Sequence, residues 1–73
     1  MLPGISIILP AFNEAENIVQ ATREVLAYCR QAGIEHEVII VNDGSLDVTG
    51  PLADRLEAEN TQVRVIHHPI NEG

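Results

Sequence analysis

With 73 residues, the chain has room for one domain, and a core of this size supplies at most about 3–5 kcal/mol of net stability. The formal charge of −7, from eleven acidic and four basic residues, argues against a nucleic-acid partner, because a surface that tracks phosphates needs positive charge. Cys29 is the single cysteine, which excludes a disulfide framework and suits a small core residue in a reducing, cytoplasmic compartment.

The first apolar run, Ile5 to Leu9, is too short to cross a bilayer, and no Lys or Arg precedes it. These features argue against both a transmembrane helix and a signal peptide. The run is typical of a buried strand instead. Pro10 ends this strand, because proline lacks the N–H group that a strand ladder needs.

A helix is predicted next, at roughly residues 14–32. Asn13 followed by Glu16 matches a capping box, and Gly33 is a natural residue just beyond a helix end. One apolar face at helical spacing follows the capping box: Ile18, Thr22, Val25, Leu26 and Cys29. The helix should therefore pack one side against a sheet.

The second strand is expected at about residues 37–42, where four successive apolar residues indicate a strand buried on both faces. Polarity then reverses, since Asn42 and Asp43 stand at the strand exit and Gly44 and Ser45 supply turn chemistry. Ligands of open α/β sheets bind beyond the carboxyl ends of the strands. Asp43 is either a carboxylate that meets a ligand or a turn residue that only satisfies backbone amides.

The last two elements are a helix and a strand. Thr49 is an acceptable N-cap, Pro51 suits a first turn, and Asn60 ends the helical pattern. Alternation from Val63 predicts a third strand near a sheet edge, which His68 and the proline after it end. The order β-α-β-α-β predicts an α/β fold with a parallel, Rossmann-like sheet and right-handed connections.

Polar and acidic residues follow the first two strands, and parallel strands would bring both exits to one crevice. In that crevice, Asp43 could accept a hydrogen bond from a ring N–H of a base, and Glu14 could accept one from a hydroxyl such as that of a ribose. The backbone amides at the start of the first helix would favour a negative group. This convergence is the functional signal in the sequence.

Other functions lack the residues that they need. No G-x-G-x-x-G or G-x-x-x-x-G-K motif is present, and no base is placed to activate Ser45, which is expected to be a turn hydroxyl. His67 and His68 should point to opposite faces of a strand, which argues against a shared metal ion. Asp47 is expected to cap a helix or a turn rather than to bind a cation with Asp43. A receiver-like domain would need an acidic cluster after the first strand and a later lysine.

Two segments carry a resemblance to a known family: ILPAFNEAENI at residues 8–18 and IVNDGSLDVT at residues 40–49. They resemble the opening of a family 2 glycosyltransferase of the GT-A fold, of the dolichol- or polyprenyl-phosphate sugar synthase type. Asn71-Glu72-Gly73 is similar to the Asn-x-Gly of that family. The resemblance covers essentially the whole chain, so residues 1–73 are interpreted as the N-terminal nucleotide-binding portion of such a domain.

The resemblance implies a UDP- or GDP-sugar donor and a set of nucleotide-binding positions. Val41 would contact the nucleotide, and Asp43 would bond the ring N–H of uracil or guanine. The base and ribose pocket would be lined by Pro10, Ala11, Phe12 and Glu14.

The family's Asp-x-Asp metal motif, catalytic base and acceptor site are not among these 73 residues. No catalytic or metal-binding residue is therefore expected here, and Mg or Mn and a membrane acceptor are expected only for a full-length enzyme. The segment alone should not transfer sugar. The alternative interpretation is a non-catalytic interaction module that kept the α/β scaffold.

Assembly is predicted from topology. Right-handed connections with the strands in the order 3-2-1 place both helices on one face of the sheet. The opposite face and the free edge of the first strand would then expose apolar surface and unpaired amides. A homo-oligomer joined through that edge or that face is the expected result.

Overall fold

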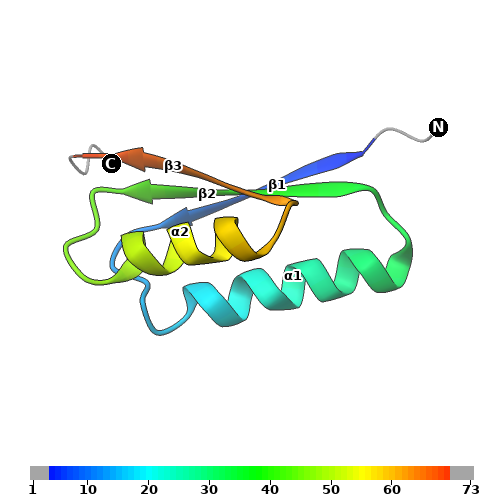
Figure 1. Cartoon of the computed structure of the whole chain (residues 1–73), viewed down its shortest axis with the longest axis horizontal. Coiled ribbons are helices and arrows are strands. Elements are labelled where there is room, and N and C mark those ends of the chain that lie inside the picture. The colour runs from blue at the N-terminus through cyan, green and yellow to red at the C-terminus, as the bar shows by residue number, and fades with distance from the viewer. Residues whose placement is uncertain (1–3, 70–73) are drawn as a thin grey trace.

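The computed structural model describes residues 4–69 and shows three parallel strands with both helices on one face of the sheet (Figure 1). The strands lie in the order β1-β2-β3, as predicted. The elements are β1 (Ile5–Ala11), α1 (Ile18–Ala32), β2 (His36–Asp43), α2 (Thr49–Glu59) and β3 (Val63–His68). The predicted parallel α/β arrangement is therefore confirmed. Neither described helix is long and apolar enough to span a membrane.

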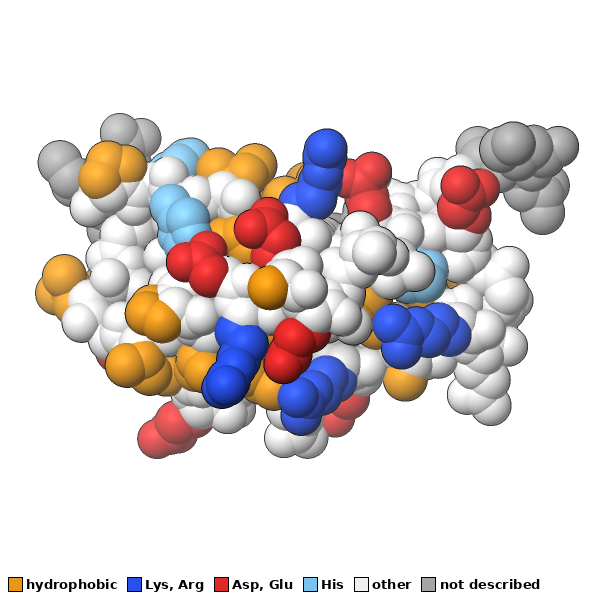
Figure 2. All heavy atoms as spheres, viewed as in Figure 1, with side chains coloured by type: hydrophobic (Ala, Val, Ile, Leu, Met, Phe, Trp, Pro, Cys, Tyr) orange, Lys and Arg blue, Asp and Glu red, His pale blue; other side chains and the backbone are white. Residues whose placement is uncertain are grey.

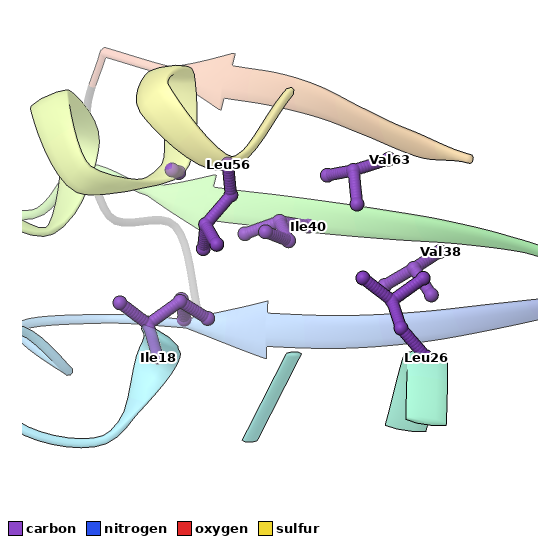
Figure 3. Close-up of a cluster of buried hydrophobic side chains, with 8 residues drawn as sticks. Ile18, Leu26, Val38, Ile40, Leu56 and Val63 are labelled. Atoms are coloured by element: carbon purple, nitrogen blue, oxygen red, sulfur yellow. The ribbon is translucent and has the colours of Figure 1, made fainter. Parts of the chain in front are cut away.

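The core lies between the middle strand and the two helices (Figure 3). Val38 and Ile40 of β2 are completely buried, and Leu26 of α1 and Leu56 of α2 pack over them. β2 has a partner strand on each side, but within residues 4–69 helices cover only one of its faces. Ile39 and Val41 on the other face are only partly buried, so the prediction of a strand buried on both faces is wrong. Cys29 is also buried, as its place on the apolar side of α1 predicted.

The predicted capping box at the start of α1 is wrong. The helix begins at Ile18, and the Glu14 carbonyl accepts hydrogen bonds from the amides of Asn17 and Ile18 at 2.9 and 2.8 Å. Asn13 instead has a left-handed backbone with φ of 52°, and its side chain bonds residues more than 30 positions away. At the other end, Gly33 has φ of 69° and closes the helix as predicted.

The start of α2 differs by one residue from the prediction. Val48 occupies the N-cap position, and Thr49 is the first helical residue. The cap bond comes from Asp47, whose Oδ1 accepts the Thr49 amide at 2.9 Å. The predicted capping role of Asp47 is thus confirmed, whereas the Thr49 hydroxyl is used elsewhere.

The sheet face away from the helices is not covered by any described residue. Leu9 and Val65 pack against the core, so their neighbours Ile8 and Ile66 point to the other face, where they are 63% and 47% exposed. We call this surface the open face. Figure 1 shows no helix on that side of the strands in residues 4–69. The strand register sets Pro10, Val41 and Ile66 in one row across it: Pro10 pairs with Val41, which pairs with Ile66.

Candidate functional site

The loops that follow β1 and β2 are joined by hydrogen bonds across a sequence separation of more than 30 residues. The Asn13 amide donates to Ser45 Oγ at 3.0 Å. In the opposite direction, Asn13 Oδ1 accepts the amides of Leu46 and Asp47 at 2.7 and 3.3 Å. A single asparagine therefore holds the second loop through both its backbone and its side chain.

Two further bonds extend this connection towards the helices. The Glu14 amide donates to Thr49 Oγ1 at 2.8 Å, and the Ala15 amide donates to Asp47 Oδ2 at 3.4 Å. The Thr49 hydroxyl in turn donates to Asp47 Oδ1. We call these residues, 13–15 and 45–49, the loop clasp.

The loop clasp uses the amides that were expected to favour a negative group. Successive amides of Asn13, Glu14 and Ala15 all donate to side-chain oxygens of the second loop or of the first residue of α2. In that loop, the amides of Leu46 and Asp47 are likewise engaged by Asn13. The amides of Glu14 and Ala15, within the predicted first turn, are therefore not available to an anion.

The turn after β2 is held by Asn42, which lies near the end of β2 and is 7% exposed. Its Oδ1 accepts the Ser45 amide at 3.2 Å, so its NH₂ group faces His67 Nδ1 at 2.9 Å. His67 Nδ1 is then the acceptor, and Nε2 donates to Asp54 Oδ1 at 2.7 Å. A Cβ at Gly50 would lie only 3.0 Å from the side-chain Nδ2 of Asn42. Glycine at this position therefore lets α2 approach the Asn42 side chain.

The two histidines lie on opposite sides of β3, as predicted. His67 faces α2, whereas His68 lies on the open face with its Nδ1 3.9 Å from Asp43 Oδ1. The sequence interpretation did not include His68 in the site. Period-two alternation along β3 was the signal that could have found it, since the register pairs His68 with Asp43.

Three of the predicted nucleotide-binding residues share one place. Pro10, Val41 and Asp43 lie on the open face at the carboxyl ends of β1 and β2, and the Asp43 side chain is 27% exposed. Phe12 follows them and is 43% exposed. Ala11 differs, because it is only 2% exposed and its side chain packs in the core, so a ligand could meet only its backbone.

Glu14 lies apart from that row, beside the start of α1. It is partly buried and lines a hollow between the free edge of β1 and the helix. The other lining residues are Leu9, Pro10, Asn17, Ile18 and Ala21. Pro10 therefore contributes to the hollow as well as to the row of residues on the open face.

The carboxyl end of the sheet has an apolar rim. Phe12, Leu46 and Val48 are 43%, 90% and 58% exposed, respectively. Figure 2 shows hydrophobic and histidine side chains at the left of the molecule, the end to which the strands of Figure 1 point. The polar residues of the strand ends are thus bordered by surface that a flat apolar group could cover.

Comparison with known proteins identifies the family of the chain. The model of glycosyl transferase family 2 matches residues 6–73. The chain belongs to this family. Its three-stranded parallel sheet is consistent with a Rossmann-like half of the GT-A fold, as expected. In this family 2 chain, the two recognised motifs supply both sides of the loop clasp.

Relatives include two proteins named for polyprenyl phosphates. The chain is 38% identical over 56 residues to an undecaprenyl-phosphate 4-deoxy-4-formamido-L-arabinose transferase of Pseudomonas fluorescens, covering 77% of this chain and 16% of that protein. It is 32% identical over 71 residues to a dolichyl-phosphate beta-glucosyltransferase of Trichomonas vaginalis, covering 90% of this chain and 21% of that protein. It is 44% identical over 66 residues to the glycosyltransferase AglD of Haloferax volcanii, covering 86% and 10%. The chain thus spans about a tenth to a fifth of the length of these relatives.

No group of three His, Cys, Asp or Glu side chains within residues 4–69 is placed to hold a metal ion. The carboxylates of the family 2 motifs have other partners or positions. Asp47 belongs to the loop clasp, while Asp43 lies on the open face beside His68.

Asp47 is the acidic group of the loop clasp that is held in its charged form. The Thr49 hydroxyl and then the Thr49 amide donate to it and lower its pKa below the ordinary value of 3.8, and the Ala15 amide adds a smaller effect. A carboxylate with a depressed pKa in the folded state stabilises the fold at pH values above 3.8. This contribution is lost as the pH falls below 3.8 and through the folded-state pKa.

We expect the loop clasp to make the protein sensitive to acid. The free energy of unfolding of the wild type should fall more steeply below about pH 4 than that of Asp47→Asn, which cannot lose this charge. Urea unfolding followed by circular dichroism at a series of pH values measures both slopes. Glu59→Gln is the control, because Glu59 is exposed and lies at the opposite end of α2 from the loop clasp. Equal slopes for the wild type and Asp47→Asn would contradict this account.

Proposed function

We propose that the chain forms the nucleoside-binding part of a sugar transferase that uses a UDP- or GDP-sugar donor. The observation that supports this function is the difference at the strand ends between backbone amides, which bond within the protein, and carboxylates, which can accept hydrogen bonds from a ligand. The loop clasp engages backbone amides of both loops. Asp43 lies on the open face beside His68, and Glu14 lines the hollow beside α1. Carboxylates accept hydrogen bonds and repel anions. The strand ends therefore suit the N–H and O–H groups of a nucleoside better than its phosphates.

In the proposed complex, Asp43 accepts the ring N–H of the base. Pro10 and Val41 lie beside it on the open face and would form an apolar wall, with Phe12 at the rim. Uracil and guanine both carry a ring N–H next to a carbonyl, whereas the corresponding ring nitrogen of cytosine and adenine is an acceptor. A carboxylate thus selects the first pair. Glu14 would accept a ribose hydroxyl from its hollow beside α1.

The phosphates need positive charge that this segment does not concentrate, since its formal charge is −7. We propose that Mg or Mn, held by residues outside this stretch, binds the diphosphate in the complete enzyme and stabilises the leaving group. Transfer would need those residues as well. Two relatives are named for undecaprenyl phosphate and dolichyl phosphate, which supports a polyprenyl phosphate as the acceptor and hence action at a membrane surface.

Removing the Asp43 charge is the direct test of this function. Asp43→Asn should weaken binding of UDP or GDP by about 1.5–3 kcal/mol, because a charged acceptor is replaced by an amide that also presents donors. NMR titration with UDP, GDP, CDP and ADP measures the affinities and locates the shifts. Glu37→Gln is the matched control, since it removes a charge from the same strand and face, six positions earlier.

The expected shifts lie in residues 10–14 and 41–45, and UDP or GDP should bind more tightly than CDP and ADP. Wild-type affinity in Asp43→Asn, or shifts confined to other residues, would overturn the proposal. Equal losses in Asp43→Asn and Glu37→Gln would also overturn it, because they would indicate a general charge effect.

A further inference from the structure

We propose that Asn13 is a positioning residue of the nucleotide site. It touches no proposed ligand group itself but holds the loop after β2 against the end of β1, and through that loop it fixes Asp43. This inference rests on the proposed function, since it concerns the same site. Its basis is the set of contacts that Asn13 makes in the loop clasp.

The segment that carries Asp43 is held at both of its ends. Asn42, immediately before Asp43, is buried and bonded to both His67 and the Ser45 amide. After Asp43, the bonds to Asn13 begin at Ser45 Oγ and continue with the Leu46 amide at 2.7 Å. Asp43 is the last residue of β2 and pairs with His68, so the sheet holds the chain up to Asp43, and Asn13 holds it again from Ser45 onward.

Apolar burial contributes little to holding this loop. Leu46 is 90% exposed and Val48 is 58% exposed, so the two large apolar side chains of the loop lie mostly in solvent. The side-chain oxygens of Asn13, Asn42 and Asp47 accept the loop amides instead. Removing the Asn13 acceptor should release the loop, and ordering it again on binding would then reduce the affinity for the nucleotide.

Asparagine satisfies two requirements at position 13. Its φ of 52° falls in the left-handed region, where Asn, Asp and Gly are the residues found most readily. Its carbonyl oxygen has two lone pairs and accepts two amides at once. Glycine would keep the backbone and lose the acceptor, whereas aspartate would keep both. These two substitutions separate the acceptor from the backbone conformation.

The experiment compares Asn13→Gly with Asn13→Asp in the whole chain, with UDP and GDP as probes. Asn13→Gly should weaken nucleotide binding about tenfold and speed hydrogen exchange at the Leu46 and Asp47 amides by a similar factor. Asn13→Asp should recover most of the affinity and most of the amide protection. Protection of the Val38 and Ile40 amides in β2 reports global stability and should change much less than protection at Leu46.

The outcomes separate this inference from the proposed function. If the wild type binds neither nucleotide, the proposed function fails and the inference fails with it. If the wild type binds and Asn13→Gly binds equally well with protected amides, the inference alone is wrong. Equal losses in Asn13→Gly and Asn13→Asp would also overturn it, because the acceptor would then not be the cause.

A second variant covers the case in which Asn13→Gly does not fold. Ser45→Ala removes the acceptor of the Asn13 amide and leaves the Asn13 side chain in place. Ser45→Ala should weaken nucleotide binding about threefold. This effect is smaller than the one expected for Asn13→Gly, because Ser45→Ala removes one hydrogen bond and Asn13→Gly removes two. Wild-type affinity in Ser45→Ala, when Asn13→Gly cannot fold, would count against the positioning role.

Discussion

Replacing Ile40 with alanine is expected to unfold most of the chain. Ile40 lies in the middle of the central strand, is completely buried, and packs against the helix layer beside Leu56 (Figure 3). Truncation of a buried isoleucine to alanine costs about 2–5 kcal/mol, because apolar contact is lost and a cavity remains. The stability expected for a core of this size is only about 3–5 kcal/mol, so one such substitution removes most of it.

Ile8→Ala is the matched control for this prediction, since it makes the same change on the neighbouring strand at a side chain that is 63% exposed. Urea unfolding monitored by circular dichroism, at a concentration low enough for every variant to be monomeric, compares the two variants with the wild type. Ile8→Ala should cost less than about 1 kcal/mol, because its side chain leaves little packed volume behind. A cooperative transition for Ile40→Ala at the wild-type midpoint would show that β2 does not form the centre of the core.

The central strand could be predicted from the sequence because its signal is local. Four successive apolar residues before Asn42 and Asp43 predict a strand at this position, and the structure places that strand between β1 and β3, although helices cover only one of its faces. The helix end at Gly33 was predictable for the same reason, since only glycine enters the left-handed conformation without a steric cost. Local patterns are reliable where the determining contacts are also local.

The role of Asn13 could not be predicted because its partners are remote in the sequence. The spacing of Asn13 and Glu16 favours a capping box, in which the asparagine would cap its own helix. The fold instead brings the amides of Leu46 and Asp47 to Asn13 Oδ1, and these bonds are made in place of the cap. A pattern of four residues contains no information about a loop more than 30 residues away.

The turn after β2 involves Asn42, the neighbour of Asp43. The turn-forming acceptor that binds the Ser45 amide is Asn42 Oδ1, one residue before Asp43. Asp43 itself points to the open face, beside His68 and in line with Val41, because successive side chains of a strand alternate between faces. The direction of Asp43 followed from the strand period, whereas the assignment of the turn to Asn42 needed the three-dimensional structure.

The 73-residue chain is expected to associate with itself. The open face exposes Ile8 and Ile66, and β1 is an edge strand whose outer side has no partner among residues 4–69. Burying a few hundred Å² of such surface at about 25 cal/mol per Å² yields several kcal/mol, which is comparable to the stability of the fold. We propose that a second copy covers this surface, because an isolated edge next to an apolar face favours pairing.

Sedimentation velocity at micromolar concentration tests this association directly, and two charge substitutions locate the contact. Ile8→Lys introduces a charge on β1, and Ile66→Lys introduces one on β3, the opposite edge of the same face. If only the Ile8→Lys variant dissociates, the interface lies at the β1 edge. If each of the two single variants dissociates, the interface lies on the open face. A folded wild-type monomer with protected β1 amides would instead show that the fold is stable with this surface exposed to water, and the prediction would be wrong. Because both isoleucines are about half or more exposed in one chain, neither lysine should unfold the monomer, so a loss of association can be assigned to the contact itself.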